Sequence, residues 1–342
     1  MFERILIHLN NLSETGTSTS VFEYALGLQD KKYQVSVAYE ANSPNNVTRV
    51  VDLFSQKFEL YPYREFYDLN RIARRNFDIG YFLKAGAIDG KKLSAVPSGI
   101  HAVFKHYEPH GERYCYVSKW LRDEMEYKRR EITKMKSLKV LLKGGKLNFN
   151  EPLEYVPHCV DLPEPNENLR KAWGIPADAI VGIRLGGMEK FDIEWVKETV
   201  LQVLKRKKNY YFIFINTQKF ASHPRIIFLP AIIIKQHKVN ALSSADFFLH
   251  ARIMGESFGM AILEAMRLRI PVFAWEGGRD LHHTQLLSKD SLYKSPSDLL
   301  EKLIKVKEYK DIVFNYEKSL EFTKEKVIDK FERVFIRSIL DR

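Results

Sequence analysis

The alternation of short apolar segments with amphipathic helical segments constrains the fold of this chain more than any other feature. Residues 5–9 form an apolar run, a polar turn containing Gly16 follows, and residues 21–29 place apolar side chains at helical spacing. Residues 34–40 then alternate as a strand does. A strand, a helix and a strand within roughly thirty residues predict parallel pairing through a right-handed crossover.

The same rhythm extends along the chain in two series. The first predicts strands at 77–83, 99–104, 113–118 and 154–157, and one basic helix over 120–142. A stretch with prolines at 157, 163, 165 and 176 indicates a linker, and a second strand–helix series begins at 179. We therefore predict an α/β protein of two doubly wound domains with a ligand in the cleft between them. The predicted domains are 1–160 and 161–318, with 319–342 forming a C-terminal helix that packs back on the first domain.

Composition is that of a packed soluble protein. The chain has 342 residues, enough for about two domains. Two cysteines are too few for a disulfide framework, and the first residues are too short an apolar stretch for a secretory signal. The longest apolar run, 226–234, is far below the ~20 residues that span a bilayer. We expect a cytoplasmic protein, either free or peripheral to a membrane.

The motif with the clearest chemistry lies within residues 250–278. Glu256 and Glu264 are eight positions apart, and an amphipathic helix begins between them near Gly259. The amides of Phe258, Gly259 and Met260 would be the unpaired N–H groups of a helix N-terminus, which favours phosphate. An ionised carboxylate on each side can accept hydrogen bonds from sugar hydroxyls.

A second motif comes directly after the first strand of the second series. Arg184 and Lys190 flank a Gly-Gly turn at the carboxyl end of that strand. A guanidinium offers a planar fork to phosphate oxygens and a lysine a point charge, so the two can converge on a diphosphate.

Together these motifs resemble the retaining glycosyltransferases of the GT-B fold, glycosyltransferase family 4. The resemblance rests on the two spaced glutamates and on three short segments within 264–278: Glu264-Ala265-Met266, Pro271-Val272-Phe273-Ala274 and Gly277-Gly278. It implies two Rossmann-like domains facing each other across a cleft. It also implies that Glu256 contacts hydroxyls of the donor sugar, that Glu264 contacts the ribose, and that Arg184 and Lys190 stabilise the leaving nucleoside diphosphate.

The resemblance also extends to the first domain. Residues 117–121, Val-Ser-Lys-Trp-Leu, match a strand-to-helix turn of the family, and family members carry a histidine near the donor sugar just before it. Three residues compete for that role: His101, which we prefer, then His110, and also His106. Gly16 is the single glycine of a turn where many relatives have two, and it would lie near the donor diphosphate.

Some motifs are absent from the sequence. No Asp-x-Asp occurs, the nearest version being residues 192–194, and no nucleotide-binding glycine motif, nucleophile elbow or Cys/His metal spacing is present. We expect metal-independent transfer of a sugar from a nucleotide sugar to a saccharide or glycolipid acceptor, with no cofactor. The alternatives are a GT-B phosphorylase, an inverting transferase, or a basic non-catalytic module that binds nucleic acid; we do not expect nucleic acid to be a partner.

The net charge of +11 is concentrated locally, because residues 128–146 hold eight Lys or Arg and one acid. Ile132, Met135, Leu138 and Leu142 fall on one face of a helix in this segment. A basic amphipathic helix can lie on an anionic membrane. The segment can equally belong to the acceptor groove, or be an insertion without a partner, and the sequence leaves these three interpretations open.

Overall fold

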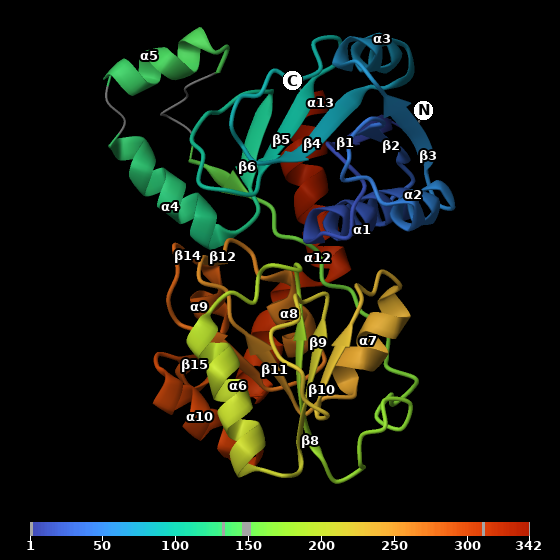
Figure 1. The fold of residues 1–342 in the computed structure, drawn as a ribbon. Helices are drawn as coiled ribbons and strands as arrows, with labels where there is room; N and C mark the ends of the chain where they lie inside the picture. Colours follow the sequence, from blue (N-terminus) through green and yellow to red (C-terminus); the bar gives the residue numbers. More distant parts are fainter. Residues whose placement is uncertain (1–2, 132–133, 146–151, 310–311, 342) are drawn as a thin grey trace. The chain divides into compact units, whose positions relative to one another are not determined.

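The computed structural model describes residues 3–131, 134–145, 152–309 and 312–341. The chain divides into two compact units, which Figure 1 draws as ribbons. The first unit comprises residues 1–159 together with 322–342, and the second comprises residues 160–321. No helix in the described ranges is long and apolar enough to cross a membrane.

The first unit contains, within the described residues, a seven-stranded parallel sheet in the order β3-β2-β1-β4-β5-β6-β7. The chain moves outward from β1 through β2 to β3 and then returns to the other side of β1, as in a doubly wound fold. The strands are β1 (Arg4–Leu9), β2 (Gln34–Glu40), β3 (Glu59–Tyr63), β4 (Ile79–Lys84), β5 (Ser98–Ala102), β6 (Arg113–Tyr116) and β7 (Glu154–Tyr155). The helices of the strand connections are α1 (Gly16–Asp30), α2 (Thr48–Ser55), α3 (Phe66–Asn76), α4 (Lys119–Arg130) and α5 (Lys134–Leu142).

The single basic helix predicted over 120–142 is wrong, because the structure divides it into α4 and α5. Ser118 caps the start of α4 by accepting a hydrogen bond from the amide of Leu121 at 3.1 Å. The basic last turn of α4 suits a helix C-terminus, where positive charge opposes the helix dipole. The Glu131 amide bonds back to the Lys128 carbonyl at 3.1 Å and tightens that end. Ile132, part of the predicted apolar face, lies outside the described residues.

The C-terminal segment belongs to the first unit. It contains α12 (Lys324–Phe331), a π-helical turn (Glu332–Arg337) and α13 (Ser338–Leu340). Phe331 packs its ring 5.0 Å from Tyr24 of α1 and 4.7 Å from Tyr81 of β4. A side chain at Gly99 of β5 would overlap Phe335, so glycine lets the last helices lie directly on the sheet.

An ion-pair network fixes this segment to α1. Glu332 is buried and accepts hydrogen bonds from Lys31 Nζ at 2.5 Å, Tyr33 at 2.8 Å and Arg337 Nη2 at 2.8 Å. Burial raises the pKa of Glu332, but these three donors and the Lys31 charge outweigh it and lower the pKa to about 2. The folded chain therefore prefers the ionised carboxylate.

Substituting Glu332→Gln should lower the free energy of unfolding by about 2 kcal/mol at neutral pH, because a charged acceptor of three hydrogen bonds is lost. The folded pKa of Glu332 is below the ordinary value of 4.5, so its contribution is complete above that value and disappears as the pH falls toward about 2. Urea unfolding of both proteins across this pH range measures the difference. The exposed Glu321→Gln is the control, and a gap between wild type and Glu332→Gln that does not shrink in acid contradicts the assignment.

The second unit repeats the doubly wound order. In its described residues a six-stranded parallel sheet runs β10-β9-β8-β11-β13-β15, beside a two-stranded sheet of β12 and β14. The strands are β8 (Ile180–Leu185), β9 (Tyr210–Ile215), β10 (Ile226–Leu229), β11 (Phe247–His250), β12 (Gly255–Glu256), β13 (Val272–Trp275), β14 (Asp280–Leu281) and β15 (Leu292–Tyr293). The helices are α6 (Glu194–Arg206), α7 (Lys235–Ser243), α8 (Met260–Arg267), α9 (His282–Leu286), α10 (Pro296–Ile304) and α11 (Ile312–Ser319).

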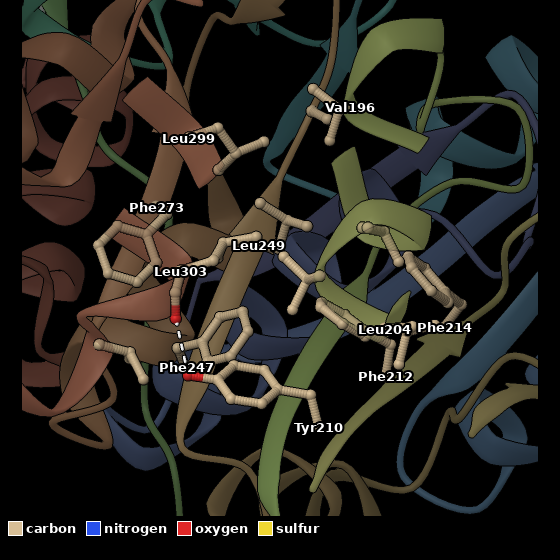
Figure 2. Close-up of a cluster of buried hydrophobic side chains, with 14 of the residues drawn as sticks. Val196, Leu204, Tyr210, Phe212, Phe214, Phe247, Leu249, Phe273, Leu299 and Leu303 are labelled. Atoms are coloured by element: carbon tan, nitrogen blue, oxygen red, sulfur yellow. Dashed lines mark hydrogen bonds between the residues drawn. The ribbon is translucent and has the colours of Figure 1, made fainter. Parts of the chain in front are cut away.

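The core of the second unit lies between this sheet and the helices α6 and α10. Val196, Val200 and Val203 repeat at i, i+4 and i+7 on α6 and are all fully buried. Figure 2 shows side chains of both helices together with aromatic side chains of the strands, and the Tyr210 hydroxyl donating to the Leu303 carbonyl of α10 at 3.0 Å. Strands that are buried on both faces of a sheet carry apolar side chains on both faces, and the strand sequences here are accordingly almost wholly apolar.

Candidate functional site

Site residues of the second unit gather where its strand order reverses. The strands β8 and β11 are adjacent and parallel, although β9 and β10 lie between them in sequence. Arg184 lies in β8, and His250 ends β11. In doubly wound sheets ligands bind beyond the carboxyl ends of the strands at such a switch point. The geometry therefore places the two sequence motifs at the carboxyl ends of neighbouring strands in one sheet.

Arg184 is a buried cation with only 4% of its surface exposed. Its Nη1 donates to the Asn216 carbonyl at 2.8 Å and to the Thr217 hydroxyl at 2.7 Å, and its Nη2 donates to the Gly187 carbonyl at 2.7 Å. Burial lowers the pKa of Arg184 to about 10, so the side chain stays charged at neutral pH. Hydrogen bonds to carbonyl oxygens therefore hold the guanidinium in place, and no carboxylate among the described residues pairs with it directly.

The Gly-Gly turn after β8 makes room for both cations. A Cβ atom at Gly186 would lie 2.8 Å from Arg184 Nη2, and one at Gly187 would lie 3.0 Å from Lys190 Cδ. Lys190 itself is exposed. Partial desolvation and the Arg252 charge lower the pKa of Lys190, and the Glu256 charge acts in the opposite direction. Lys190 is therefore within electrostatic reach of the Glu256 carboxylate.

Glu256 is held by two basic side chains that precede it. His250 Nε2 lies 3.1 Å from Oε1, and Arg252 Nη1 donates to Oε2 at 3.0 Å. Burial raises the pKa of Glu256, but the His250 hydrogen bond and the nearby positive charges lower it overall to about 2. With 21% of its side chain exposed, Glu256 presents an ionised, acceptor-only group to solvent. Sequence reasoning missed His250 and Arg252, although both stand in the segment that carries the motif.

The loop that carries Glu256 is set by backbone contacts that only glycine permits. Gly255 has φ +68°, and a Cβ there would overlap the Asp280 carbonyl. Gly278 has φ +127°, and its Cβ would lie 2.6 Å from the Gly255 amide nitrogen. The short strands β12 and β14 pair Gly255 with Asp280. Gly278 of the sequence motif therefore packs directly against the backbone of the Glu256 loop.

The helix α8 begins as the sequence predicts. Gly259 is its N-cap with φ +89°, in the left-handed region, and Met260 is its first residue. Phe258 is buried and stacks on the His282 ring at 5.6 Å. Burial lowers the pKa of His282 to about 4, so its neutral Nδ1–H donates to the Phe258 carbonyl at 2.6 Å. This packing fixes the backbone at the helix start, where N–H groups have no intrahelical acceptor.

Glu264 is buried in α8 and forms an ion pair with Lys238 of α7. Nothing in the sequence pointed to Lys238, because the two residues are 26 positions apart and on different helices. The pair supplies Glu264 with a cation beside the carboxylate that the family resemblance assigns to the ribose. Among the described residues, no group of three His, Cys, Asp or Glu side chains could hold a metal ion.

The candidate site residues of the first unit differ from one another in how far they are buried. His101 is fully buried, with Nδ1 2.6 Å from the Tyr81 hydroxyl, and burial lowers its pKa to about 3. His110 is buried too, with Nδ1 2.7 Å from the Glu108 carbonyl. The Nε2 atoms of both rings are buried without a hydrogen-bond partner in the described structure. His106 is partly exposed, and Gly16 is an exposed first residue of α1.

The two sheets with their helices have the GT-B glycosyltransferase fold, and solved structures with that fold match along the whole chain. No protein-family model matches the sequence, and no curated protein sequence matches it. The structural similarity is accompanied by low sequence identity, so it establishes the fold alone.

Three of these structures illustrate the match. A glycosyltransferase from Rickettsia africae is 11% identical, with a TM-score of 0.67 over 100% of this chain and 99% of its own. HepE from Anabaena, in complex with UDP-glucose, is 14% identical, with a TM-score of 0.68 over 97% and 98%. The lipopolysaccharide outer core galactosyltransferase WaaB, in its apo form, is 13% identical, with a TM-score of 0.60 over 99% of each chain.

Arg184→Ala should destabilise the second unit by about 3 kcal/mol, because the carbonyls of Gly187 and Asn216 lose a charged donor in a buried place. Lys190→Ala removes an exposed side chain and should change stability by less than about 0.5 kcal/mol. Urea unfolding followed by tryptophan fluorescence measures both, since three of the four tryptophans lie in the second unit. An Arg184→Ala protein that unfolds with wild type would contradict the buried hydrogen bonds.

Proposed function

We propose that the chain is a retaining glycosyltransferase that moves a sugar from a nucleoside-diphosphate sugar to a saccharide or glycolipid acceptor without a metal ion. One observation carries the proposal: a buried Arg184 without a direct ion-pair partner among the described residues, an exposed Lys190 and an ionised Glu256 are within electrostatic reach of one another at the switch point of the second unit. The solved structure of HepE with UDP-glucose supports a nucleotide-sugar donor in this fold.

The proposed donor complex uses each group for what its chemistry allows. The diphosphate lies near Lys190 and the Gly-Gly turn, where Arg184 supplies a fixed positive potential and the α8 N-terminus supplies amide dipoles. Glu256 accepts hydrogen bonds from sugar hydroxyls. Glu264, kept in place by Lys238, accepts from the ribose hydroxyls.

The charge that develops during transfer favours this arrangement. As the bond between the anomeric carbon and the diphosphate oxygen breaks, the sugar becomes oxocarbenium-like and the diphosphate gains negative charge. Cations and dipoles that are already in position stabilise that charge without reorganising, which supplies several kcal/mol. Because these groups are protein side chains and amides, we propose that no metal ion is needed for the same task.

The state of Glu256 bears on the stereochemistry. With a pKa of about 2 and two basic partners, Glu256 carries no proton to donate at neutral pH, and its partners reduce its strength as a nucleophile. We therefore propose front-face attack. The acceptor hydroxyl forms the new bond on the face from which the diphosphate leaves, and a departing phosphate oxygen takes the hydroxyl proton. Configuration at the anomeric carbon is retained.

Glu256→Gln should reduce transfer by about 100-fold, because the neutral amide loses the charge that holds the sugar hydroxyls. Binding of the nucleoside diphosphate alone should change by less than about threefold, since the diphosphate contacts other groups. Calorimetry with the best binder among UDP, GDP and ADP, and transfer rates with its sugar, measure the two effects. Glu189→Gln, an exposed neighbour of Lys190, is the matched control; equal loss in both variants would exclude the role of Glu256.

Product analysis tests the reaction itself. With EDTA present, we expect the transfer rate to stay within about twofold of the untreated rate and NMR of the product to show the anomeric configuration of the donor. Added Mn²⁺ or Mg²⁺ serves as the control for chelation. An inverted product would refute front-face attack, and a rate that returns only with the added ion would refute metal-free transfer.

A further inference from the structure

The helix α5 exposes an apolar face that nothing in the described structure covers. Met135 has 81% of its surface exposed, Leu138 56%, Leu141 51% and Leu142 79%. Figure 1 shows α5 as a separate helix that follows α4 in the first unit. Four large apolar side chains on nine residues form a contiguous stripe, unlike the single apolar residues that any surface carries.

The orientation of α5 is fixed by its opposite side. Val140, which a 3.6-residue period places across the helix from Leu138 and Leu142, is buried at 7% exposure. The Gly145 amide donates to the Val140 carbonyl at 2.9 Å, and a Cβ at Gly145 would lie 3.0 Å from Ile88 Cδ1. Just after the helix, a lysine at 143 pairs through Nζ with the carboxylate at 108 at 3.2 Å. The apolar stripe is therefore the outward face of an anchored helix.

Positive charge borders this stripe. Lys136 and Lys139 lie on α5 and are exposed, and Lys143, which pairs with Glu108, follows it. The sequence of α5 contains no acid. An apolar face bordered by lysines matches the boundary between lipid headgroups and acyl chains, where aliphatic side chains insert and ammonium groups remain among the headgroups.

We propose that α5 docks the first unit on an anionic lipid surface, with Met135, Leu138 and Leu142 inserted and Lys136 and Lys139 among the phosphates. Two other occupants fit less well. A nucleic acid would use the charges and leave four apolar side chains in water. A second copy of the chain, packed stripe to stripe, would bring two basic borders together without an opposing acid.

This inference rests on and deepens the proposed function, because an enzyme held at a lipid surface meets acceptors that are attached to lipid. The contact itself does not use the donor site, whose residues lie in the second unit. Failure of the lipid contact would leave nucleotide-sugar binding intact, and failure of the donor site would leave the lipid contact intact. Calorimetry with the nucleoside diphosphate on every variant separates the two.

Vesicle flotation of the full chain tests the contact. We expect wild type to float with vesicles of phosphatidylcholine and phosphatidylglycerol and to stay below with phosphatidylcholine alone. Lys136→Glu with Lys139→Glu should reduce the vesicle partition constant by about tenfold or more, because each basic residue near an anionic surface contributes and each acid repels. Leu138→Ser with Leu142→Ser should give a similar loss by removing inserted surface. Rising salt should weaken wild-type binding.

The controls carry comparable changes in the second unit. Lys171→Glu with Lys208→Glu changes the net charge equally at exposed positions of the second unit, and Val313→Ser removes an exposed apolar side chain there. Both should float as wild type does.

The proposal is overturned if wild type does not bind anionic vesicles, if the controls lose as much binding as the α5 variants, or if wild type floats equally on neutral vesicles. Dimerisation abolished by the leucine changes, or a nucleic-acid gel shift abolished by the lysine changes, without flotation, would instead assign the face to that other partner.

Discussion

The second unit depends on one buried positive charge that has no acidic partner among the described residues. The Arg184 guanidinium reaches the turn after β8 and the turn after β9, and it bonds to carbonyl oxygens of both. Burying an ion without a counterion costs free energy unless hydrogen bonds replace its water, and here carbonyl dipoles do so. The consequence is a fixed positive potential at the carboxyl ends of β8 and β9. The proposed diphosphate would complete the ion pair that the folded chain leaves open.

Backbone geometry determines where the negative member of the site lies. Gly255 and Gly278 have left-handed φ values and approach each other too closely for any Cβ atom, so the loops before α8 and after β13 lie against each other. That contact fixes the carboxylate of Glu256 beside His250 and Arg252. Residues far apart in the sequence motif therefore act together: the contact between the two glycines fixes the loop, and the loop positions the carboxylate of Glu256.

The sequence predicted the fold well because local periodicity determines where its strands and helices form. Strands buried on both faces and helices with one apolar stripe have distinct patterns, and β4, β5 and β6 lie within about two residues of their predicted ranges. Periodicity carries no information on contacts between distant segments, so Lys238 beside Glu264 could not be predicted. Nor could the burial of His101, because a strand with two buried faces has no polar side by which to judge where a ring points. The break after Glu131 escaped prediction because the apolar spacing continues through it.

The distribution of charge gives the two units different chemistry from similar folds. In the second unit Arg184 donates to backbone carbonyls and Arg252 donates to Glu256, so these two charges act over a short distance. In the first unit Lys136 and Lys139 of α5 are exposed beside apolar side chains, and charge at such a surface acts in solvent over about a Debye length. A short-range site suits a small, highly charged ligand that must be oriented. An exposed basic and apolar face suits an extended anionic surface with many equivalent headgroups. On such a surface the helix binds by inserting its apolar side chains and by charge attraction, without occupying one fixed position.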